Sequence, residues 1–317
     1  MATSSQINGL FICNKSEGVS SAGFLNSIKR ILKLTEPIGH GGTLDPFAEG
    51  LWIVGIGRQY TRALEYYLKG ADKTYEATII LGAGSTTYDR TGIISHMPGT
   101  KTYTKEEIKN AIKEIKARPE QMPPPVSAKK IGGIPAYRLV RQGKPFQLRP
   151  QQAALREYEI RSVETVENLT KLEIKLRVSS GFYIRSFAHD LGELLGTDGY
   201  VEYLVRAEIG FFKLPEALSL QDLQGDIELV YRSKGTVQDV GFRAFAKSLA
   251  DQMHIHGHAR NTKEGVEIIG QGTVARLSEF LEQIKKGPKG AVVEVWQDYF
   301  RKIAEKKEGF EIIKKEE

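Results

Sequence analysis

The strongest constraint on the fold lies in the last third of the chain, where the spacing of apolar residues switches repeatedly between strand and helix periods. Four segments are typical of strands: residues 227–233, 255–260, 266–269 and 292–296. Helical spacing predicts one helix from Phe242 to Met253 and a second from Leu277 to Ile284. The resulting order, strand-helix-strand-strand-helix-strand, is that of a ferredoxin-like split βαβ unit.

The first two thirds of the chain mix strands and helices without a regular βαβ repeat. Ser20 or Ser21 can cap a helix, Thr104 begins a capping box, residues 172–178 alternate as a half-buried strand, and helical spacing resumes at Phe187. We therefore predict an α+β chain of two domains, residues 1–224 and 226–317, joined by a link short enough that the domains touch.

Two segments rich in glycine and proline, residues 39–57 and 121–143, are predicted to be long loops. Loops of this length inside a compact domain are usually functional. The second loop falls in a stretch that has no acidic residue between Glu120 and Glu157 but seven cations: Lys129, Lys130, Arg138, Arg141, Lys144, Arg149 and Arg156. A solvated loop face could explain this run, but the missing acids favour contact with a polyanion.

Composition excludes several classes of protein. Hydrophobic residues make up 40% of the 317 residues and charged residues 26%, which is globular usage. No apolar run reaches the length of a membrane span, and residues 1–10 do not read as a signal peptide. The single cysteine, Cys13, excludes a disulfide framework or a multi-cysteine metal site, so we expect a reducing, cytoplasmic location.

A glycine-rich segment, GHGGTLDPFAEG at residues 39–50, contains the strongest functional signal. An aspartate in such a loop can simply cap its own turn. However, the segment resembles the catalytic loop of the TruB family of tRNA pseudouridine synthases, whose pattern is close to G-H-x-G-T-L-D-P-x-A-x-G. In that pattern Asp45 occupies the position of the catalytic aspartate.

Further motifs of the same family follow in the right order between about residues 10 and 223. They are NKSEGVSS at 14–21, KTY at 73–75, TYDRTG at 87–92, QMPPPVSAKK at 121–130, SGFYIRS at 180–186 and LVR at 204–206. Two positions depart from the family pattern: Ser16 stands where proline is usual, and Val126 where an aromatic residue is usual.

This resemblance implies an isomerase that detaches uracil from its ribose, rotates it and rejoins it through C5, without a cofactor or a metal ion. Asp45 would be the nucleophile, on the sugar or on the base, and Arg185 would keep it ionised and oriented. Tyr75 would stack on the flipped uracil and is the candidate for removing the C5 proton. The implied substrate is the T-loop of tRNA, at the uridine conventionally numbered 55.

The same resemblance implies residues that bind the RNA. Leu204 would line the pocket, His40 would fill the gap left by the flipped base, and Lys15 belongs to the N-terminal motif that would contact substrate. Four cations of the acid-free stretch would grip phosphates: Lys129, Lys130, Arg138 and Arg141. We expect the protein to act as a monomer, with no membrane partner.

The tail from about residue 226 to 317 resembles a different family, the acylphosphatases. GTVQDVGFR at 235–243 matches their signature G-x-V-Q-G-V-x-F-R except at Asp239, and residues 257–268 resemble their second motif. Arg243 would hold a phosphoryl group and Asn261 would position the attacking water. Asp239 replaces the loop glycine, where a carboxylate would repel phosphate.

Three functions therefore remain open from the sequence. The first is RNA uridine isomerisation by the first domain. The second is hydrolysis of small acyl phosphates, with the first domain a degenerate RNA-binding module, and the third is a non-catalytic tRNA-folding helper. An inactive first domain should have lost Asp45, Tyr75 or Arg185, and all three are present, which favours the isomerase.

Overall fold

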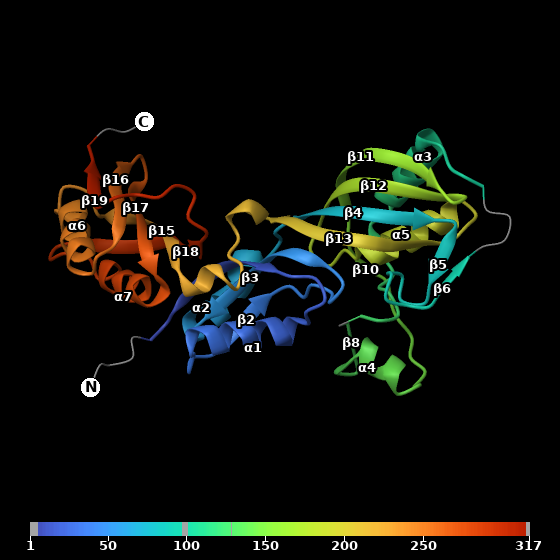
Figure 1. Ribbon diagram of the computed structural model, residues 1–317, viewed down its shortest axis with the longest axis horizontal. Coiled ribbons are helices and arrows are strands. Elements are labelled where there is room, and N and C mark those ends of the chain that lie inside the picture. Colours follow the sequence, from blue (N-terminus) through green and yellow to red (C-terminus); the bar gives the residue numbers. More distant parts are fainter. Residues whose placement is uncertain (1–5, 97–100, 128, 315–317) are drawn as a thin grey trace.

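The computed structural model describes residues 6–96, 101–127 and 129–314. Its architecture is mixed α and β, built on one large twisted sheet (Figure 1). The helices are α1 Ser21–Leu32, α2 Arg58–Leu68, α3 Lys105–Ala117, α4 Ala136–Arg141, α5 Ile184–Leu194, α6 Phe242–Gln252 and α7 Val274–Ile284. The strands of the large sheet are β1 Gly9–Lys15, β2 Ile38–Gly41, β3 Glu49–Ile56, β4 Lys73–Leu81, β11 Leu155–Val166, β12 Leu169–Val178, β13 Gly199–Ile209, β14 Phe212–Lys213, β15 Asp226–Thr236, β16 His256–Thr262, β17 Gly265–Thr273, β18 Val292–Arg301 and β19 Phe310–Ile313.

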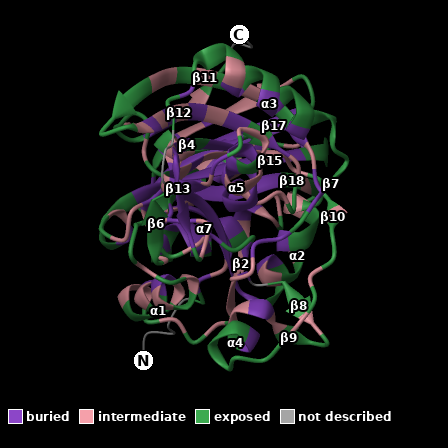
Figure 2. Cartoon of the chain, turned by 90° about the vertical axis from the view of Figure 1, so that its right-hand side faces the viewer, coloured by how far each residue is buried: buried purple, intermediate pink, exposed green. Residues whose placement is uncertain are grey.

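The remaining strands are short pairs beside this sheet: β5 Ala83–Ser85 with β6 Ile94–His96, β7 Glu120–Gln121 with β10 Gln151–Gln152, and β8 Lys130–Ile131 with β9 Ile134–Pro135. Along the large sheet the order is β11-β12-β4-β13-β3-β1-β18-β15-β17-β16-β19, with β14 beside β13 and β2 beside β3. Buried residues follow the central strands and exposed residues surround them (Figure 2). No helix in the described ranges is long and apolar enough to cross a membrane.

The predicted helix starts are confirmed. The Ser20 hydroxyl accepts a hydrogen bond from the Gly23 amide at 3.1 Å, which caps α1. Thr104 and Glu107 form the reciprocal capping box at the start of α3. The half-buried strand at residues 172–178 is the second part of β12, and the helix predicted around Phe187 is α5.

The prediction of a long loop over residues 39–57 is wrong. Strands β2 and β3 occupy most of it and pair with each other, which leaves residues 42–48 as the loop. The glycines serve close packing rather than flexibility. A Cβ at Gly55 would lie 2.8 Å from the Tyr60 carbonyl oxygen, and one at Gly41 would overlap Leu68 of α2. Only glycine lets α2 approach these strands so closely.

The segment at 121–143 is not a plain loop either. It contains the β8–β9 hairpin and the two-turn helix α4, which form a small lobe beside the main body (Figure 1). Its base is tied to α5, because the Gln121 side chain bonds both the backbone amide and the carbonyl of Tyr183. Ala136 and Leu139 are the buried residues of α4, so the lobe has little core of its own.

The C-terminal part has the predicted strand-helix-strand-strand-helix-strand order, from β15 to β18. Two features differ from the prediction. Strand β18 continues past residue 296 to Arg301, and a further strand, β19, pairs in parallel with β16.

The two parts of the chain share the sheet, because β1 pairs with β18 in parallel at Phe11 and Phe300, whose rings stack at 4.5 Å. The two domains therefore touch, as expected, and they do so through this shared sheet; we call the contact the joint. Asp298 of β18 accepts a hydrogen bond from Tyr60 of α2 at 2.5 Å and pairs with Lys285 at 2.7 Å. Burial, and then Asp298, raises the pKa of Tyr60, so the phenol keeps its proton and donates it across the joint.

Candidate functional site

The loop at residues 42–48 holds Asp45 in a fixed backbone. Trp52 of β3 donates its indole N–H to the Gly42 carbonyl at 2.8 Å, and the Ala48 amide bonds the Asp45 carbonyl at 3.1 Å. Gly42 has φ +77°, in the left-handed region that favours glycine. The loop is thus tied at both ends, and the Asp45 side chain is left partly exposed.

Arg206 braces the same loop from below. Its buried guanidinium donates to the backbone carbonyl of Leu51 at 2.8 Å and to those of Thr43 and Gly42 at 3.4 Å each. No role of its own was predicted for Arg206, because in the sequence it is one more polar residue of a half-buried strand. A buried cation must find several acceptors, and these three carbonyls supply them.

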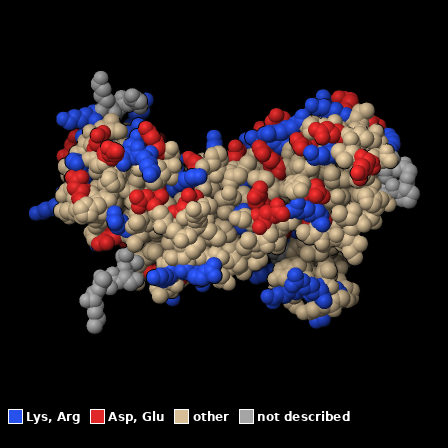
Figure 3. Space-filling view, viewed as in Figure 1, with Lys and Arg blue, Asp and Glu red and all other residues tan. Residues whose placement is uncertain are grey.

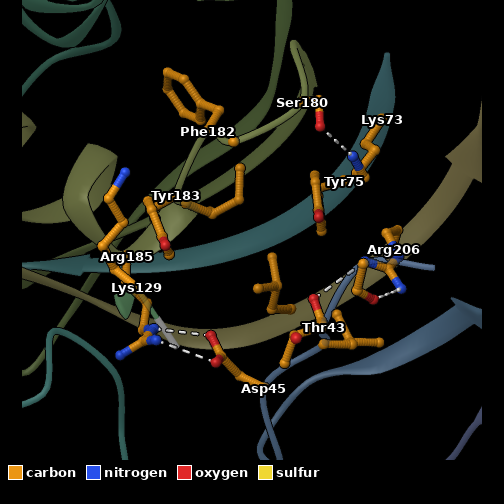
Figure 4. Close-up of a pocket in the computed structure, with 15 residues that line it drawn as sticks. Thr43, Asp45, Lys73, Tyr75, Lys129, Ser180, Phe182, Tyr183, Arg185 and Arg206 are labelled. Atoms are coloured by element: carbon orange, nitrogen blue, oxygen red, sulfur yellow. Dashed lines mark hydrogen bonds and ion pairs between the residues drawn. The ribbon is translucent and has the colours of Figure 1, made fainter. Parts of the chain in front are cut away.

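Arg185, at the start of α5, grips Asp45 with two hydrogen bonds, from Nε to Oδ2 at 2.9 Å and from Nη2 to Oδ1 at 3.1 Å (Figure 4). The arginine side chain is 5% exposed and that of Asp45 33%. Arg185 also lies 3.4 Å from the buried Asp89 and bonds the Val126 carbonyl at 2.9 Å. Paired in this way, Asp45 has a fixed orientation while one side of its carboxylate remains accessible.

A pocket of about 290 Å³ opens over this ion pair. Tyr75 of β4 and Leu204 of β13 line it and are 7% and 6% exposed. Figure 4 shows Tyr75 pointing into the pocket above Asp45. Other lining residues that the sequence analysis had not assigned include Thr43, Lys73, Ser180, Phe182 and Tyr183.

Two lysines near the pocket have unusual surroundings. Burial, and then the charge of Arg206, lowers the pKa of Lys73 to about 8, and its ammonium lies 3.4 Å from the Ser180 hydroxyl. Lys15, expected to contact substrate, is instead fully buried and donates to the carbonyls of Ser16 and Val19 at 2.9 Å each. Burial lowers its pKa to about 8 while Asp45 acts in the opposite direction. Its position makes Lys15 a support beneath the site.

His40 lies beside the pocket rather than in its lining. Its ring packs on Trp52 at 4.4 Å, and it borders a second cavity of about 540 Å³ that shares Gly42 and Ser180 with the first. Burial, and then Arg206, lowers the pKa of His40, which favours the neutral imidazole.

The cations of the acid-free stretch are exposed. Lys129 lines the pocket and donates to Gln151 at 2.7 Å, whereas Lys130, Arg138 and Arg141 lie on the β8–β9–α4 lobe. In Figure 3 this lobe, at the lower right, carries basic side chains and no acidic ones on the visible face.

A second candidate site lies at the start of α6. Asp239, Gly241, Arg243 and Asn261 line a pocket of about 230 Å³ there. Asp239 is exposed and has φ +58°, a left-handed backbone region that disfavours residues with a side chain, although asparagine and aspartate enter it more often than the others. Arg243 donates to the Ile313 carbonyl at 3.5 Å, and the buried Asn261 Oδ1 has no partner in the described ranges.

Comparison with known proteins identifies the first domain. Residues 29–184 match the model of the TruB family pseudouridylate synthase (N terminal domain). A protein named tRNA pseudouridine synthase B from Mycobacterium bovis is 38% identical over 215 residues, which cover 68% of this chain and 71% of that protein. The chain belongs to the TruB family of pseudouridylate synthases.

A solved structure supports the same fold for this TruB-family chain. The crystal structure of a Cbf5-Nop10-Gar1 complex contains a chain that is 27% identical, with a TM-score of 0.50, over 68% of this chain and 53% of that one. Residues 229–312 match the Acylphosphatase family. The acylphosphatase of Bacillus subtilis is 27% identical over 28% of this chain and 98% of its own, with a TM-score of 0.24. The match to the family model is what shows that the C-terminal domain is acylphosphatase-like.

The TruB-type site thus gathers only some of the predicted residues into one pocket. Those that line it are Asp45, Tyr75, Lys129, Arg185 and Leu204. The others surround it: His40 lines the adjoining cavity, Lys15 lies beneath, and Lys130, Arg138 and Arg141 lie on the lobe.

Proposed function

We propose that this chain is a tRNA pseudouridine synthase that isomerises the T-loop uridine conventionally numbered 55, with Asp45 as its nucleophile. One observation carries the proposal: the carboxylate of Asp45 is held by two hydrogen bonds from Arg185 at the floor of a pocket lined by Tyr75 and Leu204. The TruB-family relatives, named tRNA pseudouridine synthase B, support tRNA as the substrate.

The reaction moves one bond and one proton. The bond between uracil N1 and ribose C1′ breaks, the base turns within the pocket, and C1′ bonds to C5. The hydrogen on C5 leaves as a proton and N1 gains one, so atoms and charge balance. Asp45 attacks either C1′ or the base and is released intact at the end.

Each neighbouring group has a task in this scheme. Arg185 holds the Asp45 carboxylate in one orientation, and Tyr75 stacks on the extruded base and takes the C5 proton. Leu204 covers the apolar side of the pocket. The ring of His40 fills the gap that the flipped base leaves in the loop, and Lys129 and the lobe cations hold the flanking phosphates.

The decisive experiment replaces Asp45 with asparagine, which keeps the shape but is a poor nucleophile. Asp45→Asn should lower pseudouridine formation in unmodified tRNA by about a thousandfold or more, with tRNA affinity kept within about tenfold of wild type. Chemical mapping of pseudouridine gives the position and the rate, and mass spectrometry excludes deamidation. Turnover by the intact variant would contradict the role of Asp45. A wild type that folds tRNA but forms no pseudouridine would support the folding-helper function instead.

A second candidate function belongs to the acylphosphatase-like domain. We propose that its pocket hydrolyses small acyl phosphates slowly, because Arg243 and Asn261 line it together but Asp239 does so as well. Arg243 would bind the phosphoryl oxygens and Asn261 the water. The Asp239 carboxylate opposes an anionic substrate, and the wild-type rate on benzoyl phosphate tests this proposal directly.

A further inference from the structure

A further groove, of about 590 Å³, lies on the C-terminal domain beside the second candidate site, with which it shares Asn261. Trp296, Arg232, Arg260 and Lys263 line it. None of these four residues belongs to the lining of either candidate site.

Strand register places this groove on the face of the sheet that the helices leave uncovered. Arg232 pairs with Glu267, and Glu267 with Arg260, so the three side chains lie in a row across β15, β17 and β16. Gly270, three residues after Glu267, faces the opposite way, where Leu277 and Phe280 of α7 pack. The groove is therefore on the side away from α7.

Trp296 is exposed because it continues the alternation of Val292 and Glu294, which are exposed on the same face of β18. The pairing of β15 with β18 shifts register between Arg232 and Ser233, which leaves Trp296 without a direct partner on β15. Trp296 is 43% exposed, whereas Trp52, the other tryptophan of the chain, is fully buried. The guanidinium of Arg232 lies 5.8 Å from the Trp296 ring centre.

The charges around this ring suit an anion. Glu267, 5% exposed, binds Arg232 at 2.6 Å and Arg260 at 2.7 Å. Burial favours the protonated acid, but the bonds and charges of the two arginines outweigh it and lower the pKa of Glu267. The carboxylate thus anchors both guanidinium groups on the groove. Arg260 uses its Nε for this bond, and its terminal nitrogens have no partner in the described part of the chain.

We propose that this groove binds a single-stranded stretch of the tRNA substrate, with one base stacked on Trp296 and the adjacent phosphate on Arg260 and Lys263. The proposal rests on the proposed function for the identity of the RNA. A flat aromatic ring beside planar cations is the surface that an unpaired nucleotide recognises. Glu264, an exposed carboxylate in the lining, limits the net charge, so stacking contributes more than phosphate attraction.

The joint between the domains gives this groove a fixed place relative to the catalytic pocket. Strand β18, which carries Trp296, is the third strand from β13, which carries Leu204. Neighbouring strands are about 4.8 Å apart and residues rise about 3.3 Å along a strand, so Trp296 lies about 15 Å across the sheet from Leu204 and, by the register through β3 and β1, about 30 Å along it. An RNA molecule that contacts both must span this distance.

Fluorescence can test the stacking directly in the full-length protein. The emission of wild type minus that of Trp296→Phe isolates Trp296, since both proteins contain Trp52, the other tryptophan of the chain. Titration with unmodified tRNA should quench this difference signal, with saturation at the same concentration as binding. A difference signal that stays constant while tRNA saturates the protein would overturn the proposal. Quenching by an acidic peptide but not by tRNA would also overturn it, in favour of a protein partner.

Substitution supplies the second readout. Trp296→Ala should raise the Kd for tRNA and the KM for pseudouridine formation about tenfold, the scale of one lost base–aromatic stack, and leave kcat unchanged. Trp296→Phe should retain most of the affinity. Val292→Ala, an exposed apolar residue of the same strand, is the matched control, and equal Kd values for the two alanine variants would contradict the proposal. If wild type binds tRNA but forms no pseudouridine, the proposed function is contradicted. Loss of that tRNA binding in Trp296→Ala would then still support the groove.

Discussion

The two candidate sites of this chain differ in how their arginines are used. Arg185 is buried, grips Asp45 with two bonds and also faces Asp89. Arg243 bonds one backbone carbonyl at 3.5 Å, and the carboxylate in its pocket, Asp239, stands on a backbone that disfavours side chains. The charged residues of the first motif are thus paired with each other, whereas the second domain has its fold without such a pair. We therefore expect catalysis from the first site and only slow catalysis from the second.

The largest expected effect comes from removing the pairing in the first site. Arg185→Gln leaves Asp45 and Asp89 without their cation, so pseudouridine formation should fall by about a thousandfold. The rate on unmodified tRNA gives this number, and circular dichroism checks that the variant folds.

Two control substitutions of other arginines sharpen the comparison between the two sites. Arg177→Gln, at a half-exposed arginine of β12, and Arg243→Gln, in the second site, should each leave the rate of pseudouridine formation near wild type. A folded Arg185→Gln variant that keeps a tenth or more of the wild-type rate would show that another group orients Asp45.

A smaller effect is expected from the surface cations of the first domain. Replacing the lobe and loop cations together with alanine should raise the Kd for tRNA by about a hundredfold at moderate salt, because each phosphate contact releases counterions. The four residues are Lys129, Lys130, Arg138 and Arg141. The plot of log affinity against log salt should become less steep by about three.

The control for this variant removes the same charge elsewhere. Alanine replaces four exposed lysines of helix α3 and of the α7–β18 connection: Lys113, Lys116, Lys286 and Lys289. This control should keep the wild-type salt slope. If both quadruple variants lose affinity equally, net charge and not the lobe governs binding.

The smallest effect is expected at the second site, where one substitution should reduce the difference between the two sites. Asp239→Gly removes the repelling carboxylate and restores a residue that accepts φ +58°. Hydrolysis of benzoyl phosphate should rise about tenfold, which corresponds to about 1.4 kcal/mol of barrier. Pseudouridine formation should not change.

Arg243→Ala in the Asp239→Gly background should abolish this gain, since it removes the arginine of the pocket. If wild type does not hydrolyse benzoyl phosphate and Asp239→Gly does not either, the domain has lost its chemistry at more than one residue. A fast wild type would show that the Asp239 carboxylate does not oppose the substrate.

Local signals predicted much of the fold. The cap at Ser20, the capping box at Thr104 and the order of elements from β15 to β18 all follow from residues close together in the chain. The resemblance to two families located both candidate sites. The strands within residues 39–57 were missed because their glycines, which usually indicate loops, accommodate the close approach of α2.

Features set by distant contacts could not be predicted from the sequence. Arg206 reads as one more strand residue until the carbonyls of Gly42 and Thr43 surround it. Lys15 reads as a residue that contacts substrate until its ammonium is found on the Ser16 and Val19 carbonyls. The pairing of β1 with β18 depends on two sheet edges whose sequences give no local sign of each other.

That pairing has a consequence for how the chain is made. Phe11 and Phe300, which face each other across the two strands, are about 290 residues apart. At roughly 5–20 residues per second, a ribosome delivers β18 tens of seconds after β1. Throughout that interval, the part of the β1 edge around Phe11 stays open to pairing with other strands, and it closes only when β18 has been made.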